Sequence, residues 1–382
     1  MIQRTVGAVV VTLGLAARLL AAEPSTLDDL IKRRAETLIE ESGVVGLAVG
    51  VVDEGQTHAV CVGHRSSRGP ATDQRTLFEI GSVTKTFTGL LLADAVVRGT
   101  VKLEQPVSEL LPSNTVVPKF AEQPIRLVDL ATQTSGLPRL PTNLVPFNPF
   151  NPYAYYQVDD LYKFLAGHEL TRAPGKEYEY SNLGMGLLGH ALARQAGKTY
   201  EELLNERICG PLGMTDTAIT LSKDQASRLA SGTFMFGLPA MNWDLPAIPG
   251  CGAVRSSLRD MLIYLRANLS GTTPLAKAIA LAHEPRFTIR EANATFPDKL
   301  EIGLAWHITT DAGDKIVWHD GMTGGYAAFV ALVPGKHWGV VVLGNRATSE
   351  VDQFGNGLLK DMLKGNLPRD EEPAKGSAKR PE

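Results

Sequence analysis

Apolar positions near the start of the chain repeat with the period of an α-helix. In STLDDLIKRRAETLIEE (25–41) they form one stripe, consisting of Leu27, Leu30, Ile31, Leu38 and Ile39. Thr26 can cap this helix, and Asp28 and Asp29 favour its first turn because they complement the positive end of the helix dipole. The pattern predicts an amphipathic helix that packs against a sheet or another helix.

Both ends of the chain also contain short runs that are typical of β-strands. Near the N-terminus, VVGLAVGVVD (44–53) and THAVCVG (57–63) predict a hairpin that turns at Glu54 and Gly55. Near the C-terminus, turns rich in Asp, Gly and Pro separate four more runs, which are IGLAWHITT (302–310), KIVWHDG (315–321), GGYAAFVALVP (324–334) and WGVVVLGN (338–345). We expect a closing helix at about 349–363.

The middle of the chain has a different pattern of hydrophobic and polar residues. Helical periods such as SNLGMGLLGHALARQAG (181–197) and YEELLNERI (200–208) alternate with Pro-rich loops, and no strand pattern persists there. We therefore predict an α/β protein of the α+β type, in which both chain ends form an antiparallel sheet flanked by helices. The expected division is an α/β domain made of 23–94 and 251–365, with an α-rich domain, 95–250, inserted into it.

One segment of the middle region is too long and too aromatic for a simple connection. PRLPTNLVPFNPFNPYAYY (138–156) contains two phenylalanines and three tyrosines. We expect it to form a wall of a cleft between the two domains, the kind of place where small molecules bind. An ordered packing loop without a role in binding is the alternative.

The two ends of the chain predict segments outside the fold. MIQR is followed by an apolar run and by LLAAEP, so we interpret residues 1–22 as a signal peptide and the protein as exported to the periplasm or secreted. An uncleaved membrane anchor is the alternative, although the run is shorter than the ~20 residues of a spanning helix. The charged tail, 366–382, predicts disorder.

Composition limits the classes of binding partner that we expect. The 382 residues are 44% hydrophobic and 21% charged, with a formal net charge of −3 and both signs intermixed. No basic face is apparent, so nucleic acid and anionic membranes are not expected partners. We expect a monomer that acts on a small molecule or a peptide.

The cysteines and histidines favour neither a disulfide framework nor a metal centre. The three cysteines, Cys61, Cys209 and Cys251, are scattered and odd in number, and the eight histidines lack the spacing of known zinc sites. We expect no metal and no other cofactor.

Ser82 and Lys85 form the chain's single S-x-x-K, at the start of an otherwise apolar helix in FEIGSVTKTFTGLLL (78–92). Residues three apart share a helix face, so the ammonium can reach the hydroxyl. A serine hydroxyl is a weak nucleophile until a neighbouring base takes its proton, and a lysine can assist that step. A capping serine with a surface lysine is the alternative, but the helix offers little solvated surface.

Two further segments carry candidate chemistry. In EYEYSN (177–182), Tyr180 could transfer protons and Asn182 could bind a carbonyl group, with Tyr178 as a rival for the first role. In WHDGM (318–322), His319 and Gly321 end a strand that faces an edge, and the Met322 amide could pair with that of Ser82 to form an oxyanion hole. An N-capping asparagine, a packed tyrosine and a plain hairpin are the structural alternatives.

The order and spacing of these segments resemble the serine β-lactamase and penicillin-binding superfamily, in its class C-like branch. Its members include class C β-lactamases, D-alanyl-D-alanine carboxypeptidases, D-aminopeptidases and carboxylesterases. S-x-x-K matches directly, Tyr180-Ser181-Asn182 matches the Y-x-N of this branch, and the resemblance covers residues 26 to 364. It also extends to LFEIGSVTKTFTGLLLADAVVRGTVKLEQPVSELLP (77–112), LVDLATQTSGLP (127–138), ICGPLGMTDT (208–217) and GCGAVRSSLRDMLIYL (250–265).

The resemblance implies a β-lactamase/transpeptidase-like fold and a serine hydrolase that forms an acyl-enzyme. By position, Ser82 is the nucleophile, Lys85 and Tyr180 are the proton-transfer pair, and Asn182, His319, Gly321 and Met322 bind substrate. D-alanyl peptides and β-lactams, including peptidoglycan peptides, are the expected substrates. A carboxylesterase on the same machinery is the runner-up, and a penicillin-binding module without turnover comes third.

Two departures count against an efficient β-lactamase. The third motif is H-D-G rather than K-T-G, and a histidine with a pKa near ~6.5 is mostly neutral at pH 7. Leu140 stands where class C β-lactamases resemble one another in having a glutamine. A D-alanyl peptidase is therefore the leading hypothesis.

Overall fold

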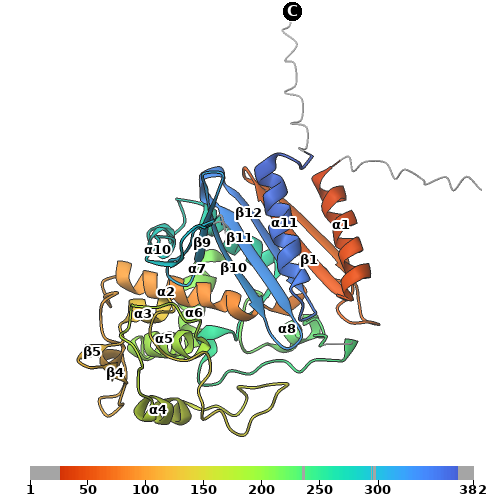
Figure 1. Ribbon diagram of the computed structural model, residues 1–382. Helices are drawn as coiled ribbons and strands as arrows, with labels where there is room; N and C mark the ends of the chain where they lie inside the picture. The colour runs from red at the N-terminus through yellow and green to blue at the C-terminus, as the bar shows by residue number, and fades with distance from the viewer. Residues whose placement is uncertain (1–25, 235–236, 294, 296–297, 369–382) are drawn as a thin grey trace, which may run out of the picture.

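The structure of the protein is a computed structural model, which describes residues 26–234, 237–293, 295 and 298–368 (Figure 1). Eight strands form one antiparallel sheet in the order β2-β1-β12-β11-β10-β9-β8-β7. Their bounds are β1 (Gly46–Asp53), β2 (Gln56–Gly63), β7 (Phe287–Arg290), β8 (Leu300–Ile302), β9 (His307–Asp311), β10 (Asp314–Met322), β11 (Ala327–Val333) and β12 (Trp338–Gly344). Because β1 pairs with β12, the two ends of the chain build the sheet together, as predicted.

Strand β1 is buried on both faces, which explains its nearly continuous apolar sequence. Leu47, Val49 and Val51 face a core shared with helices α1 (Leu27–Ser42) and α11 (Glu350–Lys364). Ala48 and Val52 face the opposite core, which includes helix α9 (Leu258–Leu269). The sheet is therefore the middle layer between helices, as Figure 1 shows for α1 and α11.

Local signals at the N-terminal end are confirmed. The Thr26 hydroxyl caps α1 by accepting a hydrogen bond from the Asp29 amide at 3.1 Å. The hairpin turns at Glu54 and Gly55, whose φ angles are +46° and +95°. Two successive residues with positive φ match the right-handed twist of the flanking strands.

The regular elements in the middle of the chain are mostly helices, separated by loops. Its elements are β4 (Lys119–Phe120), β5 (Gln123–Pro124), α3 (Leu127–Ala131), α4 (Val158–Gly167), α5 (Asn182–Gln195), α6 (Tyr200–Leu204), α7 (Gly210–Leu212) and α8 (Lys223–Arg228). Helix α2 (Thr84–Val97) contacts α5 of this region and also α10 (Ala276–Ala282). It is thus one of the elements that link the helical region to the rest of the protein. The proposed domain boundaries remain a prediction.

The sequence pattern missed several short strands. The pair β4–β5 lies inside the region for which no strand was expected, β7 and β8 extend the sheet, and β6 (Arg255–Ser257) pairs with β3 (Leu77–Glu79), which corresponds to the strand-like LFEI (77–80) before Ser82. Each has two to four residues. So few residues cannot display a period of two, and their pairing depends on tertiary contacts.

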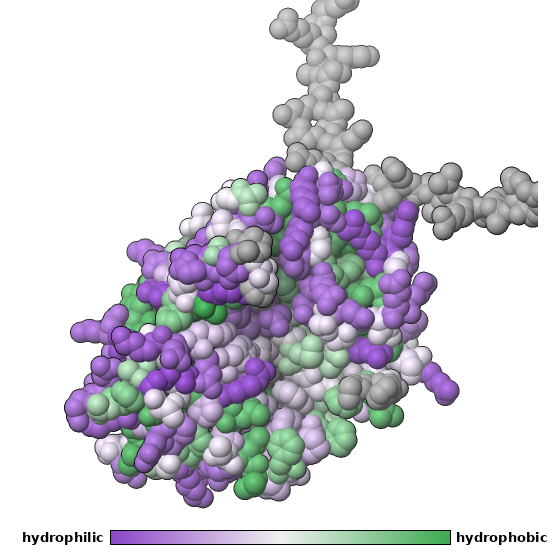
Figure 2. Space-filling model, viewed as in Figure 1, coloured by the Kyte–Doolittle hydropathy of each residue, from purple (hydrophilic) through white to green (hydrophobic). Residues whose placement is uncertain are grey.

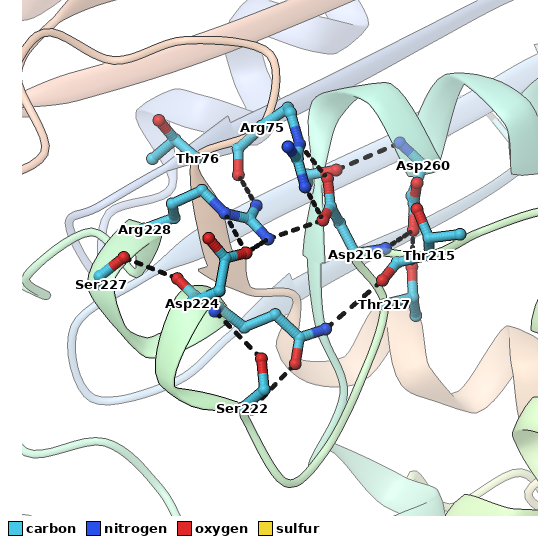
Figure 3. Close-up of polar contacts among 12 residues, drawn as sticks. Arg75, Thr76, Thr215, Asp216, Thr217, Ser222, Asp224, Ser227, Arg228 and Asp260 are labelled. Carbon is cyan, nitrogen blue, oxygen red and sulfur yellow. Dashed lines mark hydrogen bonds and ion pairs between the residues drawn. The ribbon is translucent and has the colours of Figure 1, made fainter.

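A buried polar network connects the helical region to the segment before β3 (Figure 3). The Asp216 carboxylate accepts hydrogen bonds from Arg75 at 2.9 and 3.0 Å and from Arg228 at 2.7 Å. The Asp260 carboxylate, on α9, accepts from the Asp216 amide at 2.7 Å and from the Thr217 hydroxyl at 2.9 Å. Residues far apart in sequence are fixed to one another through these carboxylates.

The surface shown in Figure 2 and the described helices do not identify a binding partner. The face in Figure 2 mixes hydrophilic and hydrophobic residues. None of the helices in the described ranges is long and apolar enough to cross a membrane. The predicted signal peptide and most of the predicted disordered tail lie outside the described residues. The three cysteines are free thiols, in agreement with the sequence prediction.

Candidate active site

Ser82 lies in a single 3-10 turn, η1 (Gly81–Val83), between strand β3 and helix α2. Every residue from Thr84 to Ala93 is buried, so α2 is a central helix and not a surface one. This burial rules out the solvated lysine of the alternative interpretation, because the Lys85 residue is 0% exposed. A rigid, buried element therefore presents the hydroxyl.

The Lys85 ammonium donates three hydrogen bonds. They reach Ser82 Oγ at 2.9 Å, Asn182 Oδ1 at 2.8 Å and the Cys251 carbonyl oxygen at 2.7 Å. Within the part of the chain that the structure describes, no carboxylate pairs with this cation. All of its partners are neutral oxygens, so its positive charge stays available to the Ser82 oxygen.

Tyr180 contacts the Ser82 oxygen, and Asn182 contacts the Lys85 ammonium. The Tyr180 hydroxyl contacts Ser82 Oγ at 2.6 Å, and its ring centroid lies 4.8 Å from Lys85 Nζ. Asn182, the first residue of α5, donates from Nδ2 to the Tyr153 hydroxyl at 2.8 Å. Tyr178, the rival in sequence, contacts His307 Nε2 at 3.2 Å instead.

The C-terminal end of β10 approaches η1 closely. Strand β9 pairs with β10 only from Asp314 to Trp318, so residues 319–322 have an unpaired edge on that side, as the sequence suggested. A Cβ atom on Gly321 would lie 2.1 Å from the Ile80 carbonyl oxygen and 3.0 Å from the Ser82 nitrogen. Only glycine fits there.

Gly81 completes this contact from the other side. Its φ is +49°, and a Cβ atom on it would lie 2.7 Å from the Met322 nitrogen. The two glycines thus bring the backbone of Met322 against the turn that carries Ser82. The geometry is compatible with two amides that point at one oxygen atom.

His319 is buried and neutral. The residue is 1% exposed, and its Nδ1 lies 2.5 Å from the Asp320 carbonyl oxygen. Burial, followed by the charge of Lys85, lowers the pKa of His319 to about 3. Burial and the neighbouring His319 also lower the pKa of His307 to about 3. The expectation of a neutral histidine in the third motif is supported, but its ring does not line the cavity beside Ser82.

A cavity of about 70 Å³ lies beside Ser82. Its lining residues come from segments far apart in the chain, namely Gly81, Ser82, Arg139, Tyr153, Asn182, Trp243, Leu245, Cys251, Gly252, Met322 and Thr323. Arg139 and Tyr153 belong to the loop 138–156, so the prediction that this loop forms a wall of the site is confirmed.

Two polar atoms of the cavity lining have no partner. Trp243 Nε1 and Thr323 Oγ1 are buried, and neither makes a hydrogen bond with any described residue. Unsatisfied buried donors are costly, and a bound molecule can satisfy them. A larger cavity of about 960 Å³ shares Trp243 and Leu245 with this one but does not include Ser82.

Sequence spacing missed one group of potential metal ligands. His307, His319 and Asp320 each place a ligand atom within 4.8 Å of the others. One nitrogen on each ring is already engaged, by Tyr178 and by the Asp320 carbonyl oxygen. We assign this group no metal.

The sequence did not identify four residues of the site and its surroundings, namely Arg139, Tyr153, Trp243 and His307. Arg139 and Tyr153 stood in a loop marked by its length and aromatic content, which was the available signal. Trp243 and His307 gave none, because only the tertiary structure brings their segments to Ser82.

The fold and this site define a class of protein. A model of the β-lactamase family matches residues 27–361, and the chain belongs to that family, in the class C-like branch of the serine β-lactamase and penicillin-binding superfamily. It is a serine hydrolase.

Among its relatives is the D-alanyl-D-alanine-carboxypeptidase/endopeptidase AmpH of Escherichia coli (strain K12). It is 31% identical over 358 residues, which cover 91% of this chain and 92% of AmpH. A β-lactamase of Pseudomonas fluorescens is 30% identical over 345 residues, covering 83% and 93% of the two chains.

Solved structures agree with the fold. A β-lactamase/D-alanine carboxypeptidase from Yersinia pestis, complexed with citrate, has a TM-score of 0.77 at 29% identity and covers 90% of this chain and 99% of its own. A class C β-lactamase has a TM-score of 0.75 at 21% identity, covering 90% and 98% of the two chains, and supports the fold alone.

Proposed function

We propose that the protein is a D-alanyl peptidase that works through an acyl-enzyme on Ser82, with β-lactam acylation as a related activity. The observation that carries the proposal is the contact of Ser82 Oγ with both Lys85 Nζ and Tyr180 Oη, at 2.9 and 2.6 Å. AmpH, a relative of similar length, is named for this peptidase activity.

In the acylation step, the Ser82 oxygen attacks the carbonyl carbon of the scissile bond. Its proton passes through Tyr180 to the nitrogen of the leaving group, so the amine departs in neutral form. The Lys85 ammonium stabilises the negative charge that develops on the serine oxygen. The amides of Ser82 and Met322 stabilise the charge on the carbonyl oxygen in the tetrahedral intermediate.

In the deacylation step, a water molecule attacks the carbonyl carbon of the acyl-enzyme ester. Its proton returns through Tyr180 to the Ser82 oxygen. The acid product and free Ser82 result. Asn182 is proposed to bind the amide of the acyl group, because its orientation is fixed by Lys85 on one side and Tyr153 on the other.

Two features favour a peptide over a β-lactam as the physiological substrate. His319, where a lysine is expected in β-lactamases of this superfamily, is buried and held neutral. Leu140 occupies the position of the glutamine that the family resemblance associates with grip on β-lactam side chains. His319 and Gly321 are proposed to support the substrate through the backbone of Met322.

A carboxylesterase is the second candidate, because the same machinery cleaves esters, whose leaving groups need less protonation. A module that is acylated without turnover is the third. We further propose that the protein is exported, acts as a monomer on a peptidoglycan peptide or a related small molecule, and uses no metal or other cofactor.

Intact-mass detection of an adduct with a labelled penicillin tests the nucleophile. The wild-type protein is expected to gain the mass of one penicillin, and Ser82→Ala is expected to gain none. An adduct on Ser82→Ala would show that another residue is the nucleophile. A wild-type adduct that never decays, without turnover of any substrate, would indicate the non-turnover module.

Rates on a D-Ala-D-Ala peptide, a cephalosporin and a p-nitrophenyl ester, measured side by side, test the substrate class. Peptide cleavage is expected to exceed cephalosporin cleavage in kcat/KM. Fast ester cleavage without peptide or cephalosporin turnover would make the esterase the better assignment.

A further inference from the structure

Arg139 is the charged residue in the lining of the Ser82 cavity. Its side chain is exposed, and its guanidinium carbon lies 4.8 Å from the centroid of the Tyr180 ring. Across the described ranges, this guanidinium has no hydrogen-bond or ion-pair partner. Its donors are therefore available to a ligand in the cavity.

The backbone of Arg139 is fixed to the segment that carries Tyr180. Its carbonyl oxygen accepts hydrogen bonds from the amides of Asn182, at 3.1 Å, and Leu183, at 3.4 Å. The Pro138 carbonyl oxygen accepts the Ser181 hydroxyl at 2.7 Å. The guanidinium is thus held beside Tyr180 by three hydrogen bonds of its own segment and by the face of the aromatic ring.

Apart from Arg139, none of the described groups near Ser82 offers an exposed positive charge to an anionic ligand. Lys85 is buried and donates to three protein oxygens. His319 and His307 are buried and neutral. No aspartate or glutamate is among the lining residues to oppose Arg139. The accessible positive charge of the cavity is therefore that of Arg139.

The position of Arg139 also indicates which part of a substrate it meets. In the proposed mechanism, Tyr180 protonates the leaving nitrogen, so the Tyr180 ring marks the leaving-group side of the cavity. In a C-terminal amino acid, one carbon atom separates that nitrogen from the carboxylate. A guanidinium over the Tyr180 ring is well placed for this carboxylate, which it can bind through two parallel hydrogen bonds.

We propose that Arg139 binds the carboxylate of the leaving group and makes the enzyme selective for acyl donors whose leaving group ends in a free carboxylate. The inference rests on the proposed acyl-transfer function and deepens it. It distinguishes a carboxypeptidase from an enzyme that cleaves esters or internal peptide bonds without regard to charge. An arginine that only packs on Tyr180 would act equally on every substrate.

Two matched substrate pairs test this selectivity. One pair is N,N′-diacetyl-L-lysyl-D-alanyl-D-alanine and its C-terminal carboxamide. The other is the phenylacetylglycyl ester of 3-hydroxybenzoic acid and that of 3-hydroxybenzamide. Within each pair the acyl group is the same, and the leaving group differs in a single carboxylate.

For the wild-type protein, kcat/KM is expected to favour the acid over the amide in each pair. Arg139→Gln is expected to reduce this acid-to-amide ratio by about 10- to 100-fold, the range for loss of a charge-assisted hydrogen bond. Arg139→Lys keeps the charge and is expected to retain an intermediate ratio. Arg98→Gln, which removes an exposed arginine at the end of α2, is the charge-matched control and should leave the ratio unchanged.

The inference fails if Arg139→Gln lowers the acid and the amide equally, because Arg139 would then act through Tyr180 alone. It also fails if the wild-type protein shows no preference for the acid. If esters are cleaved and peptides are not, the peptidase assignment is wrong, while the ester pair still decides the role of Arg139.

Discussion

Two polar clusters of this protein handle charge in opposite ways. In the network of Figure 3, Asp216 is surrounded by Arg75 and Arg228. Around Ser82, the Lys85 ammonium contacts only neutral oxygens, and Arg139 has no partner in the described part of the chain. The first cluster pairs its charges internally. The second holds the Lys85 charge at the Ser82 oxygen and leaves the charge of Arg139 for a ligand.

The pKa values follow the same division. Burial by itself would raise the pKa of Asp216, but the hydrogen bonds and charges of Arg75 and Arg228 outweigh it and hold the pKa below its usual value. Near Ser82, burial and the charge of Lys85 lower the pKa of His319 to about 3. One cluster stabilises an ionised side chain by pairing it with opposite charges, and the other disfavours a further positive charge on His319. A structural network and a reactive site thus differ in what they leave unpaired.

The largest effect is expected for Lys85→Met. Loss of the ammonium should lower kcat/KM by about 10³-fold or more, because both the activation of Ser82 and the stabilisation of its charge are lost. Stability should change by no more than about 1 kcal/mol, since removal of a buried unpaired cation offsets the lost hydrogen bonds. Steady-state kinetics and urea unfolding measure the two quantities. Near-normal activity would contradict the proposed role.

Gly321→Ala should rank second. The added methyl group would lie 2.1 Å from the Ile80 carbonyl oxygen, so β10 and η1 must move apart. A displaced oxyanion donor typically costs about 10²-fold or more in kcat. Gly335→Ala is a suitable control, because its Cβ would meet nothing within 4 Å. Equal kcat values for the two variants would show that the amide of Met322 is not needed.

Asp216→Asn is expected to lower stability and to leave activity nearly unchanged, which is the opposite of the expectation for Lys85→Met. The Asp216 side chain is 1% exposed, and its loss of charge leaves Arg228, at 10% exposed, without a buried partner. We expect the free energy of unfolding to fall by about 3 kcal/mol while kcat/KM stays within about twofold. Urea unfolding and the substrate assays would show this. A large loss of activity in a stable variant would mean that the two clusters are coupled.

The last prediction concerns the pH dependence of stability rather than activity at a fixed pH. The folded pKa values of His319 and His307 are lowered to about 3 from the usual histidine value of about 6.5, so the unfolded chain binds protons first as pH falls. Their contribution to stability is complete above 6.5 and is lost between 6.5 and about 3, at up to about 1.4 kcal/mol per pH unit for each histidine.

Replacement of one histidine tests this slope. His319→Gln should give a shallower fall of stability between pH 6.5 and 4 than the wild-type protein, as measured by thermal unfolding. Asp216, with its lowered pKa, should lose its contribution only at more acidic pH, as pH falls from the usual aspartate value of about 3.9 through the folded pKa. An unchanged slope in His319→Gln would contradict the neutral, buried state of the ring.

Much of the fold could be predicted from sequence because its signals are local. The capping threonine, the hairpin turn at Glu54 and Gly55 and the apolar strands near the C-terminus are properties of neighbouring residues, and the structure confirms them. Most strands of two to four residues could not be predicted, because so few residues cannot display a period of two. The order and spacing of the three motifs, rather than any single motif, identified the family.

By itself, the sequence determined that Ser82 and Lys85 share a helical face, because three residues nearly complete one turn. It did not determine that Tyr180 rather than Tyr178 reaches Ser82, or that His319 is buried. Nor did it place Arg139 over Tyr180. These outcomes depend on how α5, β10 and the loop 138–156 pack around α2, and such long-range contacts are set by the whole folded chain rather than by any segment of it.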